Sequence, residues 1–178
     1  MAIRKIVTYP DKRLREKSEA LGDESEILSL YVDLMESMAA HRGVGLSAVQ
    51  IGVLKTAFIV DARVFGQQGR TPILFCNPRI TFYSEDKETS EEGCLSFPGY
   101  FANIARSNRI IISYDTFEPG QQGFPAVQDR ELEGFAARAV QHEYDHLNGK
   151  LYLDLMEAKE KDKTQKLFIA LKNSGKLK

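Results

Sequence analysis

Hydrophobic residues recur at helical spacing in the segment Glu26–His41. Its apolar positions lie three or four residues apart and form a stripe along one side of a helix: Ile27, Tyr31, Leu34 and Met38. Asp23 or Ser25 can cap the start of this helix, and Gly43 follows its end. The pattern therefore predicts an amphipathic helix that packs on a core.

Two more helices are predicted nearer the C-terminus. Gly134–Leu147 carries apolar residues on one side and is followed by Asn148 and Gly149, which are typical of a helix end. Glu157–Lys172 is rich in charged residues, so we expect it to form a helix at the surface.

Between the first two helices lie short segments rich in Ile, Val, Phe and Tyr. They predict β-strands at Thr56–Val60, Pro72–Cys76, Ile80–Tyr83 and Arg109–Tyr114. The segment Glu118–Gly123 (EPGQQG) predicts a turn. Because strands and helices do not alternate regularly, we expect an α+β fold with mostly antiparallel short strands around the helix Gly134–Leu147. No repeat or linker divides the chain, so we expect residues 1–178 to form one domain that ends in a helix or tail at about 157–178.

Composition and charge narrow the class of protein. Hydrophobic residues make up 43% and charged residues 28% of the chain, which is ordinary for a globular protein. Lys and Arg number 24 against 25 Asp and Glu, so the net charge of −1 provides no general attraction to nucleic acid or membranes. The N-terminus lacks the apolar segment of a signal peptide, and two cysteines are too few for a disulfide-stabilised secreted fold. We therefore expect a cytoplasmic protein.

The motif HEYDH in the second predicted helix carries the clearest chemistry. His142 and His146 are four residues apart, so both imidazoles lie on one helix face and can bind one metal ion. Glu143 follows the first histidine, where a carboxylate can take a proton from metal-bound water and pass it to a leaving group. Two of the 3 histidines of the chain belong to this motif, which argues against a chance pairing.

A catalytic metal site of this kind needs a third protein ligand, and the residues leave two alternatives open. Glu157 or Glu160 would be a downstream carboxylate ligand, as in thermolysin-like peptidases, although both lie in a charge-rich segment. Cys94, in the sequence EGCLS, would supply a soft thiolate next to Gly93, where the backbone can approach closely. A lone cysteine is otherwise most often a small buried hydrophobic residue.

Three motifs, GVGLSAVQ, EGCLS and HEYDHLNG, resemble in this order the motifs of peptide deformylases, which usually read GxGLAAxQ, EGCLS and HExDH. They span the chain from Gly43 to Gly149. Ser47 stands where Ala is common and Val49 where Pro is common, and these departures are expected to affect loop stiffness more than activity. The resemblance implies a metal-dependent amidase that removes the formyl group from the N-terminal formyl-methionine of nascent polypeptides.

The resemblance also implies a role for each motif residue. The metal ligands would be Cys94, His142 and His146, and the general acid and base would be Glu143. After metal-bound hydroxide attacks the formyl carbonyl, the side-chain amide of Gln50 and the backbone N–H of Leu95 would stabilise the oxyanion. The implied metal is Fe²⁺, with Ni²⁺, Co²⁺ or Zn²⁺ as substitutes, although this ligand set should bind Zn²⁺ more tightly than Fe²⁺.

Specificity is expected to come from a pocket for the methionine side chain beside the metal. Its expected lining residues are Val44, Gly45, Phe135, Arg138 and Ala139. Arg138 lies one turn before His142, and either its stem lines the pocket with the guanidinium in solvent or the whole side chain lies at the surface. The loop Pro98–Ala102 is expected to pair with the extended peptide by strand addition.

Other polar residues have structural interpretations. His41 ends the first predicted helix, where a cation favours the helix dipole, and Cys76 lies in an apolar segment typical of a core. Arg106 is expected to pair with Glu92 and hold the cysteine loop. Asp145 would either orient a metal ligand or be solvated.

Lysines concentrate at the C-terminus, with seven between Lys159 and Lys178 against Glu160 and Asp162. Such a segment is usually a solvated face, but in an enzyme that acts on nascent chains it can also contact ribosomal RNA. We expect no membrane partner and no sequence-specific nucleic-acid binding. Two alternative functions are a zinc peptidase that cleaves internal peptide bonds without using Cys94, and a binding module without turnover.

Overall fold

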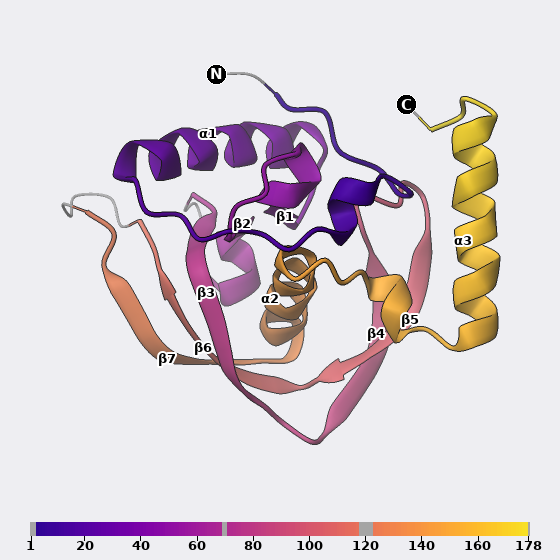
Figure 1. The fold of residues 1–178 in the computed structure, drawn as a ribbon. Helices are drawn as coiled ribbons and strands as arrows, with labels where there is room; N and C mark the ends of the chain where they lie inside the picture. The colour runs from indigo at the N-terminus through magenta and orange to yellow at the C-terminus, as the bar shows by residue number, and fades with distance from the viewer. Residues whose placement is uncertain (1–2, 69–70, 118–122, 178) are drawn as a thin grey trace.

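The helix α2 lies at the centre of the computed structural model, between α1 and the strands, and α3 runs along one side (Figure 1). The structure describes residues 3–68, 71–117 and 123–177, so the turn predicted at Glu118–Gly123 lies almost entirely outside the described residues. The helices are α1 (Glu24–Ala40), α2 (Gly134–Leu147) and α3 (Ala158–Asn173). The strands are β1 (Gly45–Ser47), β2 (Ala57–Val60), β3 (Ile73–Tyr83), β4 (Lys87–Gly93), β5 (Phe101–Ser107), β6 (Arg109–Asp115) and β7 (Ala126–Glu133).

Five strands form an antiparallel sheet in the order β1-β2-β3-β6-β7, and β4 and β5 form a separate antiparallel pair. Apolar side chains of β2, β3 and β6 pack against α2, and Phe58 stacks on Phe75 with ring centroids 4.8 Å apart. The predicted α+β class with antiparallel pairing is confirmed. None of the helices in the described part of the chain is long and apolar enough to cross a membrane.

The first helix begins two residues before its predicted start. Asp23 caps it, because its carboxylate accepts a hydrogen bond of 3.1 Å from the backbone N–H of Glu26. The predicted apolar stripe is buried, and Leu34 is fully inaccessible. It packs on Leu46 and Ile59 of β1 and β2, so α1 covers the end of the sheet that leads to the GVGLSAVQ loop.

The strand β3 joins two segments that the sequence predicts as separate strands. Asn77 lies between them with a φ of 47°, and the register against β6 shifts between Cys76 and Arg79. Asn tolerates this left-handed conformation, and its side-chain amide is held by both backbone groups of Leu21, at 2.9 and 2.8 Å. The expected break is therefore a bulge within one strand.

The strands β4 and β7 have no counterpart in the predictions. Their sequences, KETSEEG and AVQDRELE, are mostly polar, and most of their residues are exposed or half-buried. Their conformation comes from pairing with β5 and β6, because an antiparallel neighbour satisfies the backbone groups of a strand whatever its side chains.

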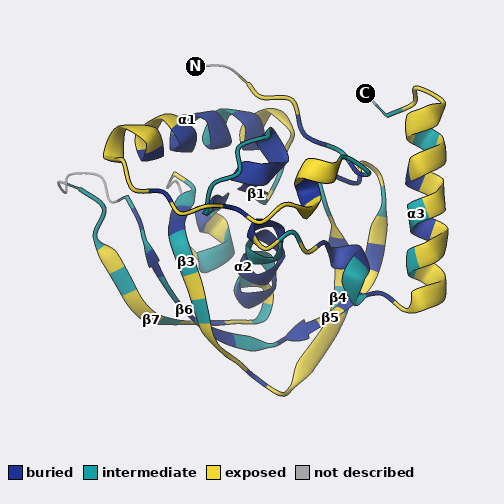
Figure 2. Cartoon of the chain, in the orientation of Figure 1, coloured by how far each residue is buried: buried dark blue, intermediate teal, exposed yellow. Residues whose placement is uncertain are grey.

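The helix α2 has the predicted bounds and is mostly buried, whereas α1 and α3 are exposed on their outer sides (Figure 2). It packs against β1, β2, β5 and β7, so both faces meet protein. The chain turns sharply after it at Gly149, which has a φ of 67°. A Cβ there would lie 2.4 Å from the carbonyl oxygen of Arg15, so only glycine fits this position.

The C-terminal helix α3 is anchored at one buried aromatic residue. Phe168 lies with its ring centroid 5.0 Å from that of Phe97 and is 1% exposed. Leu167 and Ile169 are each 44% exposed, so α3 presents a mainly solvated surface, as predicted. Phe168 nevertheless belongs to the core that supports the cysteine loop.

Candidate metal centre and active site

Three side chains from two separate segments come together beside the C-terminal half of α2. Cys94 follows β4, and His142 and His146 lie one turn apart on α2. Their candidate ligand atoms all lie within 4.8 Å of one another, and the Cys94 Sγ is 3.3 Å from His146 Nε2. The structure thus places the cysteine beside the histidines. Glu157 and Glu160 are exposed and belong to no such group among the described residues.

The chemistry of this cluster fits a divalent transition metal. A thiolate and two imidazoles are ligands that such ions prefer, and three protein ligands are typical of a catalytic site, which keeps one further position for water or substrate. Both histidines of the cluster are buried, at 9% exposed for His142 and 1% for His146, and Cys94 is half-buried. Beside the cluster, Glu143 Oε2 is a buried carboxylate oxygen without a hydrogen-bond partner in the described structure.

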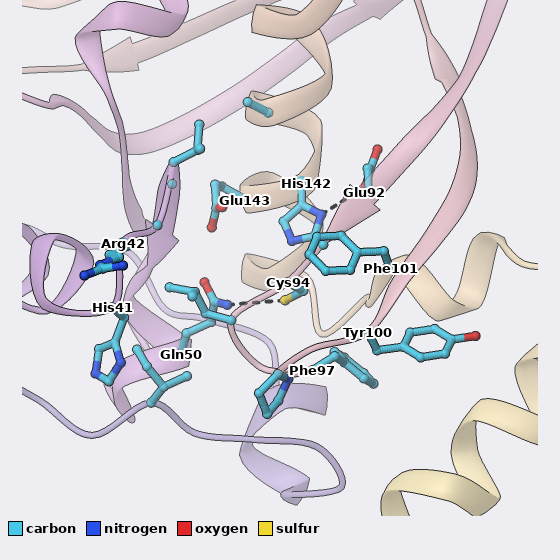
Figure 3. A pocket seen from close by; sticks show the side chains of 18 of the residues that line it. His41, Arg42, Gln50, Glu92, Cys94, Phe97, Tyr100, Phe101, His142 and Glu143 are labelled. Atoms are coloured by element: carbon cyan, nitrogen blue, oxygen red, sulfur yellow. Dashed lines mark hydrogen bonds and ion pairs between the residues drawn. The ribbon is translucent and has the colours of Figure 1, made fainter.

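The imidazole of His142 is oriented by Glu92. Its Nδ1 lies 3.0 Å from Glu92 Oε2, as Figure 3 shows, and Nε2 is left to face the cluster. A carboxylate partner of this kind holds the ring of a metal-binding histidine and raises its basicity. Glu92 is held in turn by Arg106, at 2.6 and 3.0 Å, which confirms the predicted pair.

Burial by itself would raise the pKa of the Glu92 carboxyl. Hydrogen bonds from His142 and Arg106 outweigh this effect and lower the pKa to about 2, so the carboxylate stays ionised. Arg106 also donates to Asp145 at 2.8 Å. Asp145 is therefore linked to the imidazole of His142 through Arg106 and Glu92. This link favours its predicted orienting role over simple solvation.

Arg138 lines the cavity, as one prediction has it, but its guanidinium is not in solvent, and the alternative prediction of a surface residue is wrong. The residue is 6% exposed, and its guanidinium donates to Glu92 Oε1 at 2.7 Å. It also donates to the carbonyl oxygens of Ile104 at 2.8 Å and Glu88 at 2.6 Å. The β4–β5 pair supplies these acceptors, so the guanidinium is satisfied inside the protein. Arg138 still contributes to the cavity wall.

Arg138→Met is expected to destabilise the fold by about 3 kcal/mol, because it leaves the buried carbonyl of Ile104, the part-buried carbonyl of Glu88 and one buried carboxylate oxygen of Glu92 without this donor. Loosening Glu92 should also weaken metal retention through His142. Chemical denaturation and metal content measured on the same preparation test both effects. Arg109→Met, which removes an exposed pair with Glu131, is the control and should change the stability much less. Unchanged stability of Arg138→Met would contradict the assignment.

Gln50 is held in the short 3₁₀ helix Ala48–Ile51 (η2), with its side-chain amide facing the cluster. Its Oε1 accepts hydrogen bonds from the backbone N–H and the hydroxyl of Ser47, at 2.9 and 3.0 Å. Its Nε2 donates to Cys94 Sγ at 3.5 Å, a contact drawn in Figure 3, and to Ser96 Oγ at 3.2 Å. Ser47, expected to affect loop stiffness more than activity, thus orients this amide through a hydroxyl that Ala would lack.

The glycines of the first motif let the loop approach α2. A Cβ on residue 45 would lie 2.6 Å from Glu143 Oε1, and one on residue 43 would lie 2.9 Å from Leu95 Cδ1. Glycine at both positions therefore brings the loop onto the glutamate and the cysteine segment. Glu143 is 5% exposed, and burial raises the pKa of its carboxyl to about 7. A carboxyl group with such a pKa can both accept and donate a proton near neutral pH.

A cavity of about 710 Å³ opens beside these groups. All five predicted pocket residues line it: Val44, Gly45, Phe135, Arg138 and Ala139. Three aromatic residues near the cysteine segment, which the sequence analysis did not name as pocket residues, also line it: Phe97, Tyr100 and Phe101 (Figure 3). Gly93 is the feature of the sequence that points to Phe101. The two residues pair across β4 and β5, and a Cβ on residue 93 would lie 2.6 Å from the Phe101 ring.

Strand addition at Pro98–Ala102 is only partly open. Phe101 and Ala102 already pair with Gly93 and Glu92 of β4. The segment 91–93 of β4 also lines the cavity, and its other edge has no partner strand in the described part of the chain. This edge of β4 is therefore a second place, besides the predicted loop, where strand addition is geometrically possible.

An HExxH helix with a neighbouring cysteine, a buried glutamate and an adjoining cavity is the kind of site found in metal-dependent hydrolases. The model of the polypeptide deformylase family matches residues 3–162. The chain therefore belongs to the polypeptide deformylase family. Members of this family remove the N-formyl group from nascent polypeptides in a metal-dependent reaction, and this is the activity of the present chain.

Individual relatives agree over nearly the whole length. The peptide deformylase of Agrobacterium fabrum is 37% identical over 169 residues, which cover 94% of this chain and 95% of that protein. The crystal structure of a peptide deformylase from Legionella pneumophila superposes with a TM-score of 0.83 at 31% identity and covers 99% of both chains. A structure of the Ehrlichia chaffeensis enzyme in complex with actinonin has a TM-score of 0.79 at 35% identity, covering 94% of this chain and 96% of that one.

Proposed function

We propose that Glu143 is the general acid and base, that Gln50 and the backbone N–H of Leu95 stabilise the oxyanion, and that three residues hold the metal: Cys94, His142 and His146. The observation that supports this proposal best is the buried, unpartnered carboxylate oxygen of Glu143 beside the three candidate ligands. A buried carboxylate without a partner is costly in a purely structural role, and it is useful where it exchanges protons with a substrate.

When bound, the metal supplies a Lewis acid that polarises the carbonyl and lowers the pKa of water. Glu143 accepts the proton of the attacking water, and the new bond joins the water oxygen to the formyl carbon. The Nε2 of Gln50 and the N–H of Leu95 donate to the oxygen on which negative charge develops. Glu143 then passes its proton to the departing nitrogen as the C–N bond breaks, which yields formate and a free amino terminus.

Two observations support the oxyanion roles. Ser47 fixes the orientation of the Gln50 amide, so this amide loses little conformational entropy when it donates a hydrogen bond to a substrate. The Leu95 N–H donates to no backbone carbonyl among the described residues. Removal of one such donor typically lowers the rate by about 10²–10³-fold.

We assign the cavity to the methionine side chain, with apolar contacts from Val44, Phe135 and Ala139. Exposed apolar side chains support this role, since Val44 is 46% and Phe135 60% exposed in the free protein. The unpaired edge of β4 would bind the backbone of the peptide, so that its first side chain enters the cavity.

The metal proposed for the cell is Fe²⁺, by resemblance to the family. Thiolate and imidazole ligands accept both Fe²⁺ and Zn²⁺, and intrinsic affinity favours Zn²⁺, so supply would decide which ion is bound. The test is formate release from formyl-Met peptides by protein loaded anaerobically with Fe²⁺ or with Zn²⁺. Higher turnover with Fe²⁺ is expected. Cleavage of internal peptide bonds, or binding of formyl peptides without formate release, would contradict the proposal.

We also propose that the lysine-rich segment contacts ribosomes and that the protein works in the cytoplasm, where nascent chains are made. The exposed side chains of Lys159, Lys163 and Lys176 support this, because no ion pair among the described residues involves them. The buried Phe168 shows that cutting the chain before α3 would expose core surface, so truncation is a poor test.

Replacing Lys159, Lys163 and Lys176 together with Gln is expected to weaken co-sedimentation with ribosomes and to flatten its salt dependence. Each lost phosphate contact removes about one released counterion from the salt slope. The melting temperature and the hydrolysis of short formyl-Met peptides should stay close to wild type. Phe168→Ala is the comparison, since it should lower the melting temperature through the core. Unchanged ribosome binding of the triple variant would contradict docking by this segment.

A further inference from the structure

Two exposed cations, Lys5 and Arg42, line the substrate cavity. The imidazole of His41 also belongs to the lining. Figure 3 shows His41 and Arg42 together on one wall, across from Phe101 and Tyr100. Neither Lys5 nor Arg42 takes part in an ion pair found among residues 3–68, 71–117 and 123–177. Their charges are therefore available to a ligand.

Arg42 occupies a backbone position that normally favours glycine. The helix α1 ends in a Schellman motif, in which Gly43 N–H donates to Met38 O at 3.0 Å and Arg42 N–H donates to Ala39 O at 3.2 Å. Arg42 is the left-handed residue of this motif, with a φ of 56°. A large side chain here costs stability relative to glycine, so the helix end does not explain the arginine.

The other charges of the cavity do not neutralise these two cations. Glu92 and Arg138 are buried and bonded to each other, and Glu143 is buried beside the candidate metal ligands. Glu91, on β4, is the remaining acidic residue of the lining and is exposed. Two exposed cations against one exposed carboxylate leave the accessible lining with a net positive charge.

The chain holds both cations close to the reacting groups. Arg42 is three residues from Gly45, so the Cα atoms of Arg42 and Gly45 are at most about 10 Å apart. Gly45 in turn lies against the side chain of Glu143. Lys5 lies two residues before Val7, and the backbone N–H of Val7 donates to the carbonyl oxygen of Gln50 at 2.8 Å. An extended peptide advances about 3.3 Å per residue, so the cations are within reach of the second or third residue of a substrate.

We propose that Lys5 and Arg42 form a selectivity site for an acidic side chain at the third residue of formylated peptides. This inference rests on the proposed placement of the formyl group at the metal centre. The carboxylate of an Asp or Glu would pair with the guanidinium of Arg42, and Lys5 would add its charge to the same region. Such exposed pairs act on binding more than on chemistry, so the preference belongs in KM.

The test compares formyl-Met-Ala-Glu-Ala-amide with its Gln and Lys counterparts. The amide removes the terminal carboxylate, so the Glu side chain is the one carboxylate in the substrate set. We expect kcat/KM for the Glu peptide to exceed that for the Gln peptide by about three- to tenfold at low salt, through KM, and the Lys peptide to be poorest. The ratio should fall toward one at about 1 M salt, where screening is strong.

Three variants and one control variant separate the effect of charge on the Glu-to-Gln ratio from the effect of the helix cap on stability. Arg42→Gly suits the left-handed position, so it should keep or raise the melting temperature while the Glu-to-Gln ratio falls at least twofold. Arg42→Lys should retain most of the ratio, and Lys5→Gln should lower it in part. Arg79→Gln removes an exposed arginine outside the cavity and should leave the ratio at the wild-type value.

A ratio that is equal in wild type and Arg42→Gly, or a wild-type ratio of one, would overturn the selectivity site. Formate release from the Gln peptide keeps this result separate from the proposed function. If no peptide releases formate, the catalytic assignment fails first. If the Gln peptide is hydrolysed and the ratio is one, only the inference about Lys5 and Arg42 is wrong.

Discussion

Glu143→Gln is expected to lower kcat by about 10²–10⁴-fold while the metal content stays at the wild-type level. The amide keeps the shape of the carboxylate, so the close contact with Gly45 is preserved. It cannot take a proton from water or return one to the leaving nitrogen. The raised pKa of the Glu143 carboxyl, about 7 because of burial, is the physical basis of both steps.

The measurement is formate release at saturating substrate, together with the metal content of the same sample. Glu157→Gln is the matched control, because Glu157 is the alternative carboxylate ligand considered from sequence and lies exposed before α3. It should keep both rate and metal. Loss of metal together with rate in Glu143→Gln would instead make Glu143 a ligand.

Cys94→Ser is expected to lose most of the bound metal during purification, or to change its preference among Fe²⁺, Ni²⁺ and Zn²⁺, with turnover falling accordingly. A serine hydroxyl is a harder and weaker ligand than a thiolate, so it binds these ions less tightly beside two imidazoles. The same thiolate is open to oxidation, so peroxide should inactivate the wild-type enzyme.

Metal analysis after gel filtration, followed by competition between the three ions, tests this expectation. Cys76→Ala is the control, because Cys76 is fully buried and burial raises the pKa of its thiol to about 12. It is an inert core residue, as the sequence predicted, and its replacement should leave the metal in place. Full activity of Cys94→Ser with unchanged metal would revive a carboxylate as third ligand.

Local patterns in the sequence determined the parts of this protein that depend on near neighbours. The periodicity of apolar residues located α1 and α2, because helix formation and burial both follow a 3.6-residue repeat. The four-residue spacing of His142 and His146 placed both on one helix face for the same reason. The three motifs identify the family from the sequence alone.

The tertiary structure decided what depends on residues far apart in the chain. It folded the polar segments β4 and β7 into strands through their partners, and it turned the expected break at Asn77 into a bulge. It placed the guanidinium of Arg138 inside the protein, bonded to a carboxylate 46 residues away. It also brought Lys5 and Arg42 to the lining of the same cavity. No local pattern encodes such contacts, because their energies depend on which surfaces and charges meet only after the chain has folded.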